Sequence, residues 1–175
     1  MHASEWNGSQ TAASMICTWD ADLGPITWYA PSQPCCSVYI PVFWTGDVPA
    51  CMKDAEGVYS QDSLWWVSQR LAALVSVDEE RFGPGVRTAL SNLEARIAMR
   101  ELTAVVSARN FIEDKCKEDA MAVLSDITEE AAEMAMETFA RLADGISREI
   151  ENDGGLYGTR KEFLEAYAER VNMPL

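Results

Sequence analysis

The stretch SQTAASMICTWDADLGPITWYAPSQPCCSVYIPV, residues 9–42, decides the fold because it carries the only convincing β-strand pattern in the chain. Residues 11–20 alternate between the two sides of an extended chain, so Met15, Cys17 and Trp19 share one face. Few polar side chains interrupt the faces of this stretch. We therefore expect other elements of the fold to cover both of its faces.

Turn residues separate this strand from two further ones. Gly24 and Pro25 mark a turn, and residues 26–30, which follow it, are β-branched and aromatic. Residues 36–43 form a third extended run, in which Pro41 indicates a strand end or a sheet edge. We expect the first two strands to pair as an antiparallel hairpin, with the third close by.

Helical patterns fill the rest of the chain. The apolar spacing of residues 63–77 predicts a helix in which Trp65 and Trp66 cannot both lie on the apolar stripe, so one of them must pack against a loop or a strand. The sequence Phe-Gly-Pro-Gly at residues 82–85 predicts a break, and residues 84–124 then form one long helix.

Capping signals predict where the remaining helices begin and end. Asp126 and Glu129 have the spacing of a capping box, so a second long helix is expected from there to about residue 151, packed antiparallel to the first. Residues 152–155 stop it, and residues 159–171 form a last helix. With strands in residues 1–45 and mainly helices in residues 60–173, the sequence predicts an α+β fold in a single domain, residues 1–175.

Composition narrows the possible functions. The chain has 175 residues, is 48% hydrophobic and 24% charged, and so belongs to the globular class. Its net charge of −14 argues against nucleic acids and anionic membranes as partners. No apolar run is long enough to cross a bilayer, and no signal-peptide pattern is visible. These features predict a cytoplasmic protein and are compatible with a homo-oligomer.

The cysteines do not form a recognisable framework. There are five, irregularly spaced, which is not the pattern of a disulfide-stapled domain. Cys35 and Cys36 are adjacent, and no Cys-x-x-Cys occurs. Because His2 is the single histidine, a zinc site would need an unusual ligand set. We therefore expect reduced thiols and no cofactor.

The order of motifs resembles one enzyme family. The motifs are PITWYA at residues 25–30, P-x-x-S-V-Y-I-P-V at residues 34–42, Gly46, Val48-Pro49, and Y-S-x-D-S-x-W-W at residues 59–66. This order resembles the C-terminal half of the cysteine dipeptidases related to secernin, which are N-terminal-nucleophile (Ntn) hydrolases. The resemblance covers about residues 9–75, and beyond it only the helical pattern continues.

The resemblance implies a four-layer αββα sandwich and metal-free hydrolysis of dipeptides by a thiol. In the family the nucleophile is a cysteine that becomes the first residue of the mature chain, and its own amino group is the base. Here residue 1 is Met, and the first cysteine, Cys17, lies inside a predicted strand. The chain thus resembles a C-terminal portion with no catalytic residue of its own. Its expected partners are a dipeptide substrate and a missing N-terminal half.

Candidate binding residues lie around the first strand and in the hairpin. Asn7 and Thr11 can donate or accept hydrogen bonds at the start of the strand, and Trp28 can line a peptide cleft. These three are the predicted substrate-binding residues. Cys17 alternates with apolar neighbours and is better explained as a small core residue than as a nucleophile.

Two alternatives stay open at this stage. One is a related Ntn amidase or acyltransferase, which would share the sheet and differ in its pocket. The other is a non-catalytic interaction domain, in which the aromatic hairpin and the acidic helices bind a partner protein.

Overall fold

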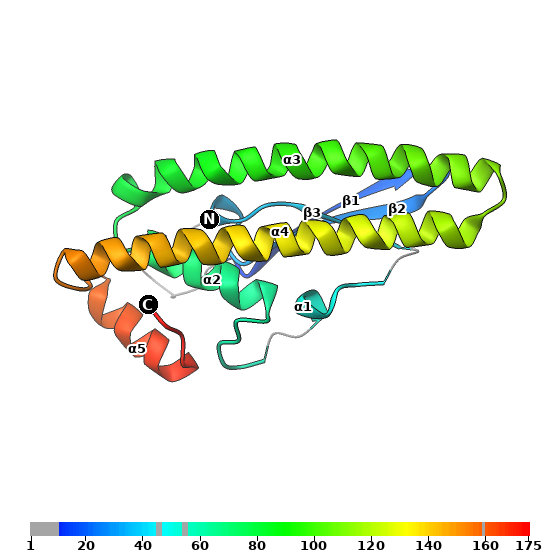
Figure 1. Cartoon of the computed structure of the whole chain (residues 1–175). Helices are drawn as coiled ribbons and strands as arrows, with labels where there is room; N and C mark the ends of the chain where they lie inside the picture. The colour runs from blue at the N-terminus through cyan, green and yellow to red at the C-terminus, as the bar shows by residue number, and fades with distance from the viewer. Residues whose placement is uncertain (1–10, 45–46, 54–55, 159) are drawn as a thin grey trace.

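The computed structural model describes residues 11–175 except 45–46, 54–55 and 159. The fold is α+β, as predicted: a three-stranded antiparallel sheet comes first and long helices follow (Figure 1). The elements, in chain order, are β1 (Ala13–Asp20), β2 (Gly24–Pro31), the short 3-10 helix η1 (Pro34–Cys36), β3 (Ile40–Phe43), α1 (Ala50–Lys53), α2 (Leu64–Val75), α3 (Glu79–Glu113), α4 (Lys117–Asn152) and α5 (Lys161–Val171).

The predicted hairpin is confirmed. Strands β1 and β2 pair antiparallel, and β2 pairs with β3 in the order β1-β2-β3. The carboxylate of Asp20 closes the turn by accepting hydrogen bonds from the backbone N–H groups of Asp22 and Leu23, each at 3.0 Å. Gly24, at φ +78°, supplies the left-handed backbone that starts β2.

The third strand is shorter than predicted. Residues 36–39 do not belong to it, because Pro34 opens the 3-10 turn of η1 and pairing with β2 begins only at Ile40. Pro41 does lie on an edge strand, as expected.

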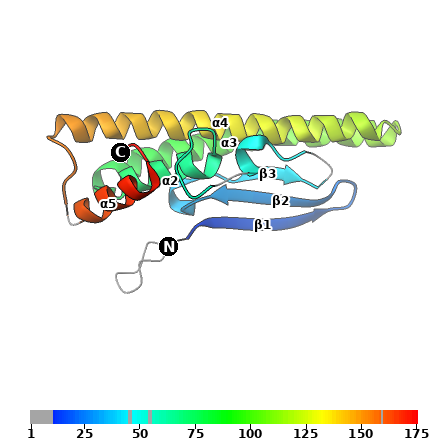
Figure 2. The same ribbon diagram turned by 90° about the horizontal axis from the view of Figure 1, so that it is seen from below.

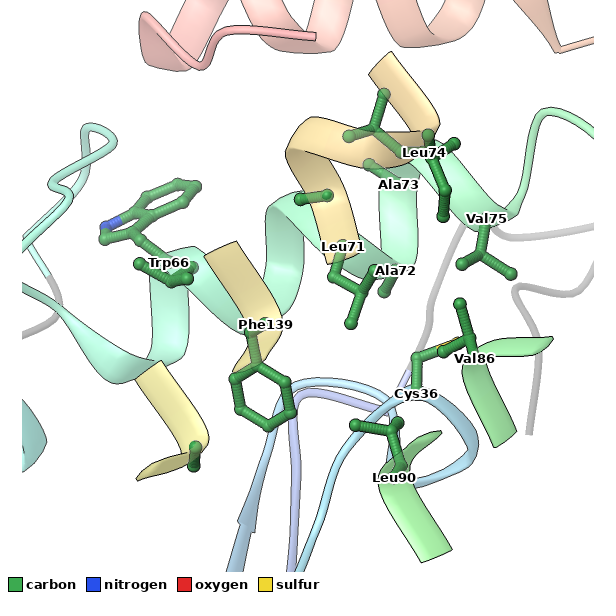
Figure 3. Close-up of a cluster of buried hydrophobic side chains, with 14 of the residues drawn as sticks. Cys36, Trp66, Leu71, Ala72, Ala73, Leu74, Val75, Val86, Leu90 and Phe139 are labelled. Carbon is green, nitrogen blue, oxygen red and sulfur yellow. The ribbon is translucent and has the colours of Figure 1, made fainter. Parts of the chain in front are cut away.

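Helix α2 is buried on nearly its whole circumference. It lies between α4, the sheet and the C-terminal segment, and its apolar side chains pack with Phe139 of α4 and with Cys36, Val86 and Leu90 (Figure 3). Both tryptophans of the pair also reach other segments of the chain. The indole N–H of Trp65 donates to the carbonyl of Ala12 at 2.7 Å, and that of Trp66 to the carbonyl of Glu56 at 2.9 Å.

The break predicted at residues 82–85 is wrong, because α3 begins earlier and runs through it. Asp78 caps the helix by accepting a hydrogen bond from the N–H of Arg81 at 3.1 Å. Pro84 has no N–H to donate to the carbonyl one turn back, so the helix lacks one hydrogen bond there and continues.

The predicted division of the long helices is also wrong, although two long helices do pack antiparallel side by side (Figure 1). The break lies at residues 114–116 and not near residue 125. Lys115 takes a left-handed φ of 64°, and its N–H donates to the carbonyl of Ile112 at 3.1 Å. The N–H of Cys116 donates to the carbonyl of Phe111 at 2.8 Å, which completes a Schellman turn. Residues 126–129 lie inside α4.

The C-terminal end of the molecule closes over α2 and α4. The guanidinium of Arg70 pairs with Asp144 at 2.6 Å and donates to the carbonyl of Pro174 at 2.8 Å. Helix α4 stops at the predicted place, where Gly154 has φ +94°, and α5 follows. Among the helices in the described part of the chain, none is long and apolar enough to cross a membrane.

Candidate binding face on the sheet

The two faces of the sheet have different surroundings. On one side, which we call the helix face, Ile26 and Phe43 are buried against Ala104 and Ala108 of α3 and Leu124 of α4. The register places Ile16, Trp28 and Pro41 on this same side. The opposite side, which we call the open face, carries the side chains of Met15, Cys17, Trp19, Thr27, Tyr29, Ile40 and Val42.

The open face is covered only in part. Ile40 is fully buried in the large cluster with α2 and α4. Towards β1, Met15 is 63% exposed and Trp19 is 77% exposed, and Trp44 just after β3 is 80% exposed. Met15 and Trp44 border a shallow groove of about 520 Å³. Its described lining carries no charge and consists of Met15, Thr27, Tyr29, Val42, Phe43, Trp44, Val48 and Met52. The groove therefore suits an apolar or aromatic ligand or a neutral protein surface.

Strand β1 is exposed on both faces, contrary to the expectation that other elements cover it. None of its eight residues, all of which the structure describes, is buried. Even on the helix face Ile16 is 48% exposed. The physical reason is the strand order: β3 lies beside α4, and β1 is the strand farthest from that helix (Figure 2).

Charged side chains fasten the far end of the hairpin to α3. The guanidinium of Arg109 pairs with Asp20 at 2.5 Å and lies 3.6 Å from a carboxylate oxygen of Asp22. The pKa of Asp20 is lowered, first by the backbone N–H groups of Leu23 and Asp22 and then by Arg109. The hairpin is therefore held in place although β1 contributes nothing to the core.

The cysteines are free and chemically unlike one another. Cys17 is exposed on the open face, where its sulfur lies 3.7 Å from the hydroxyl of Thr27. Burial and the neighbouring Cys35 raise the pKa of Cys36 to about 12, so this thiol stays protonated. Burial also raises the pKa of Cys51. In the described ranges, no three His, Cys, Asp or Glu side chains lie close enough to hold a metal ion.

The predicted binding residues do not converge on the groove. Asn7 lies outside the described residues. Thr11 is half-buried just before β1. Ile16, which lies opposite Trp28, is about 16 Å farther along the strand. Trp28 is half-buried on the helix face, where it packs beside the cluster of Ile26 and Phe43. A binding role for these residues stays a prediction.

The sequence pattern did not point to Thr27, Val42 or Met52 as residues of the groove. The alternation that places Met15, Cys17 and Trp19 on one face did indicate which side of β1 they share. Met52 belongs to α1, and the local sequence pattern does not show that this helix returns to the open face.

Comparison with protein families, with curated proteins and with solved structures gives no match for this chain.

Proposed function

We propose that this chain is the C-terminal portion of a cysteine dipeptidase of the Ntn type, or of a related Ntn amidase or acyltransferase. In this proposal it supplies one sheet-and-helix half of an αββα sandwich and one wall of the peptide cleft. The thiol nucleophile belongs to a partner segment that begins with cysteine, and the chain alone is inactive. The working enzyme is a cytoplasmic peptide hydrolase without a cofactor.

The observation that supports this proposal is the unequal covering of the sheet. Helices α3 and α4 lie against one face, and on the other the apolar side chains of Met15, Trp19 and Val42 remain accessible. In an αββα sandwich each sheet has helices on its outer face and a second sheet on its inner face. The open face has the composition that an inner face requires.

The groove accounts for the share of the cleft that this chain would provide. Tyr29 presents a ring and a hydroxyl, and burial raises the pKa of that hydroxyl, so it stays a neutral donor at physiological pH. Around it, Met15, Val42 and Met52 offer apolar contacts to side chains of a short peptide. Catalysis would still need the thiolate and the amine of the partner segment.

The test uses the purified chain with a panel of dipeptides, alone and mixed with a cysteine-starting segment encoded upstream at the same locus. We expect no turnover by the chain alone and turnover in the mixture. Val42→Glu, which places a charge on the open face, should abolish the activity of the mixture. The matched control is Phe163→Glu on α5, which alters an exposed ring far from the sheet and should leave activity unchanged.

Turnover by the lone chain that disappears in Cys17→Ala would contradict the proposal, because an internal cysteine would then be the nucleophile. N-acylated substrates in the same panel separate the dipeptidase from the amidase or acyltransferase, since only the latter would prefer them.

A second candidate is a non-catalytic interaction domain. The observation that favours it is an exposed apolar stripe on α3, formed by Met99, Leu102 and Val106 at positions i, i+3 and i+7. This stripe lies outside the open face, so the αββα sandwich would leave it unused. Tight association with the upstream segment without turnover of any substrate in the panel would favour this candidate.

A further inference from the structure

The outer edge of β1 consists of backbone groups that no strand in the described part of the chain pairs with. In an antiparallel ladder, alternate residues direct their N–H and C=O groups towards the neighbouring strand, and the residues between them direct these groups away from it. Which residues of β1 point outwards follows from the prolines of β2. Pro25 and Pro31 have no N–H to donate, and they lie opposite Trp19 and Ala13.

These prolines therefore occupy the pairs that are not hydrogen bonded. The outward-pointing residues of β1 are then Ala13, Met15, Cys17 and Trp19. The third strand supports this assignment, because Pro41 lies opposite Trp28, which must then point towards β1. The same residues that place side chains on the open face thus place their backbone groups on the outer edge.

This edge has none of the features that usually prevent strand pairing. Natural edge strands carry lysines, prolines or bulges, and β1, with the sequence ASMICTWD, contains neither lysine nor proline. Its register with β2 is continuous over all eight residues, which leaves no bulge. Its one charged residue, Asp20, is neutralised by Arg109.

We propose that the outer edge of β1 pairs with the same edge of a second copy of this chain, antiparallel about a two-fold axis at Cys17. The two three-stranded sheets would then join into one continuous sheet. About six new backbone hydrogen bonds would form, two at Cys17 and two at each pairing of Met15 with Trp19. The interface would be isologous, as in most homodimers.

The side chains of β1 are complementary to themselves about this axis. Met15 would lie opposite Trp19 of the partner subunit, and Trp19 opposite the partner's Met15, so each thioether would meet an indole. The small side chain of Cys17 at the axis leaves room for both pairs. A shift by one residue would place inward-pointing groups at the contact, and a shift by two would separate Met15 from the partner's Trp19, so both alternatives are less favourable.

Charge is the reason to favour a second copy at this edge in particular. Two chains of net charge −14 repel each other over most of their surfaces. The strip Ala13–Trp19 carries no charged side chain, so two copies can approach there without placing like charges opposite each other. The contact uses the edge of the sheet, leaves the groove on the open face accessible, and does not depend on the proposed enzymatic function.

The decisive experiment places a proline at an outward-pointing position. Cys17→Pro removes one outward N–H and leaves the β1–β2 ladder intact, so it should convert the dimer into a folded monomer. Cys17→Ala is the matched control, since it keeps the N–H and should remain a dimer. The measurement is sedimentation equilibrium over a dilution series, with circular dichroism to confirm the fold.

A second variant keeps the test valid if Cys17→Pro fails to fold. Cys17→Lys places two positive charges opposite each other at the axis, so the dimer should weaken in low salt and recover as added salt screens the repulsion. A wild-type chain that is monomeric at every concentration would overturn the proposal. So would a dimer that both variants leave unchanged, because its interface would then lie elsewhere.

Discussion

Helix α2 and strand β1 are both rich in apolar side chains, yet α2 is almost entirely buried and β1 is exposed. Eleven of the twelve residues of α2 are buried, including its polar residues Ser68, Gln69 and Arg70. None of the eight residues of β1 is buried, including Met15, Ile16 and Trp19. The apolar content of a segment thus indicates that it needs a partner surface, and does not indicate that the same chain supplies it.

The difference follows from the position of each element. Helix α2 lies between α4 and the sheet, so its partners come from the same chain. Strand β1 lies at the edge of the sheet that is farther from α4, and the helices bury none of its residues (Figure 2). The contrast predicts that changes in α2 affect folding and that changes in β1 affect association.

The largest effect is expected in the core around α2. Leu71→Ala should lower the free energy of unfolding by about 3 kcal/mol, because a fully buried leucine leaves a cavity among α2, α3 and α4. Met15→Ala on β1 should change it by less than about 0.5 kcal/mol. Urea unfolding of both variants, at a protein concentration low enough to keep the chain monomeric, measures the difference. Equal losses would show that β1 is buried in solution.

A smaller effect is expected from proline at neighbouring positions of β1. Thr18→Pro removes an N–H that points towards Ile26 and should cost about 2 kcal/mol of monomer stability. Cys17→Pro removes an outward N–H and should cost less than about 1 kcal/mol. Thermal unfolding of the two monomers compares them directly. A larger loss for Cys17→Pro than for Thr18→Pro would mean that Cys17, and not Thr18, points its N–H towards β2.

A pH-dependent effect is expected at the turn of the hairpin. The folded-state pKa of Asp20 lies below its ordinary value of 3.8, so its stabilising contribution is present above that pH and is lost as the pH falls through the folded-state value. Asp20→Asn should therefore lower stability at pH 7 by under about 1 kcal/mol and have no effect in strong acid. Asp22→Asn, which loses only a contact of 3.6 Å, should have less effect. Unfolding curves at several pH values test this, and a loss that persists in strong acid would contradict it.

The smallest effect on stability is expected for Trp19→Thr, which should leave the unfolding curve unchanged within error. The same change should reduce the binding of a hydrophobic dye such as ANS, because it removes the one aromatic ring of β1, which is 77% exposed. Phe163→Thr, which removes an exposed ring from α5, is the control. Dye binding that falls equally in both variants would show that the open face is not a special surface.

The hairpin and the general order of elements could be predicted because their signals are local. Alternation in residues 11–20 and the turn at Gly24 specify pairing between neighbours in sequence. The ends of the long helices could not be predicted, because the residues at these positions are ones that rarely end a helix or lie inside one. Lys115 adopts a left-handed backbone conformation that sequence patterns assign to glycine. Pro84 is the predicted start of α3, but the helix begins five residues earlier, directly after its cap Asp78, and Pro84 lies inside it.

The candidate site was less predictable than the fold. The groove joins Tyr29 of β2, Val42 of β3 and Met52 of α1, which come together only after the sheet has formed. The burial of β1 was predicted wrongly because periodicity shows which side chains share a face, and the covering of that face depends on elements far along the chain.

Interactions with the helices at both ends of β1 have a consequence for association. At one end the indole N–H of Trp65 donates a hydrogen bond to the carbonyl of Ala12, and at the other end Arg109 forms an ion pair with Asp20. Between them lies a strand that is already extended and paired on its inner side. An incoming strand would therefore meet a pre-organised template, and little conformational entropy of β1 would be lost when the two associate.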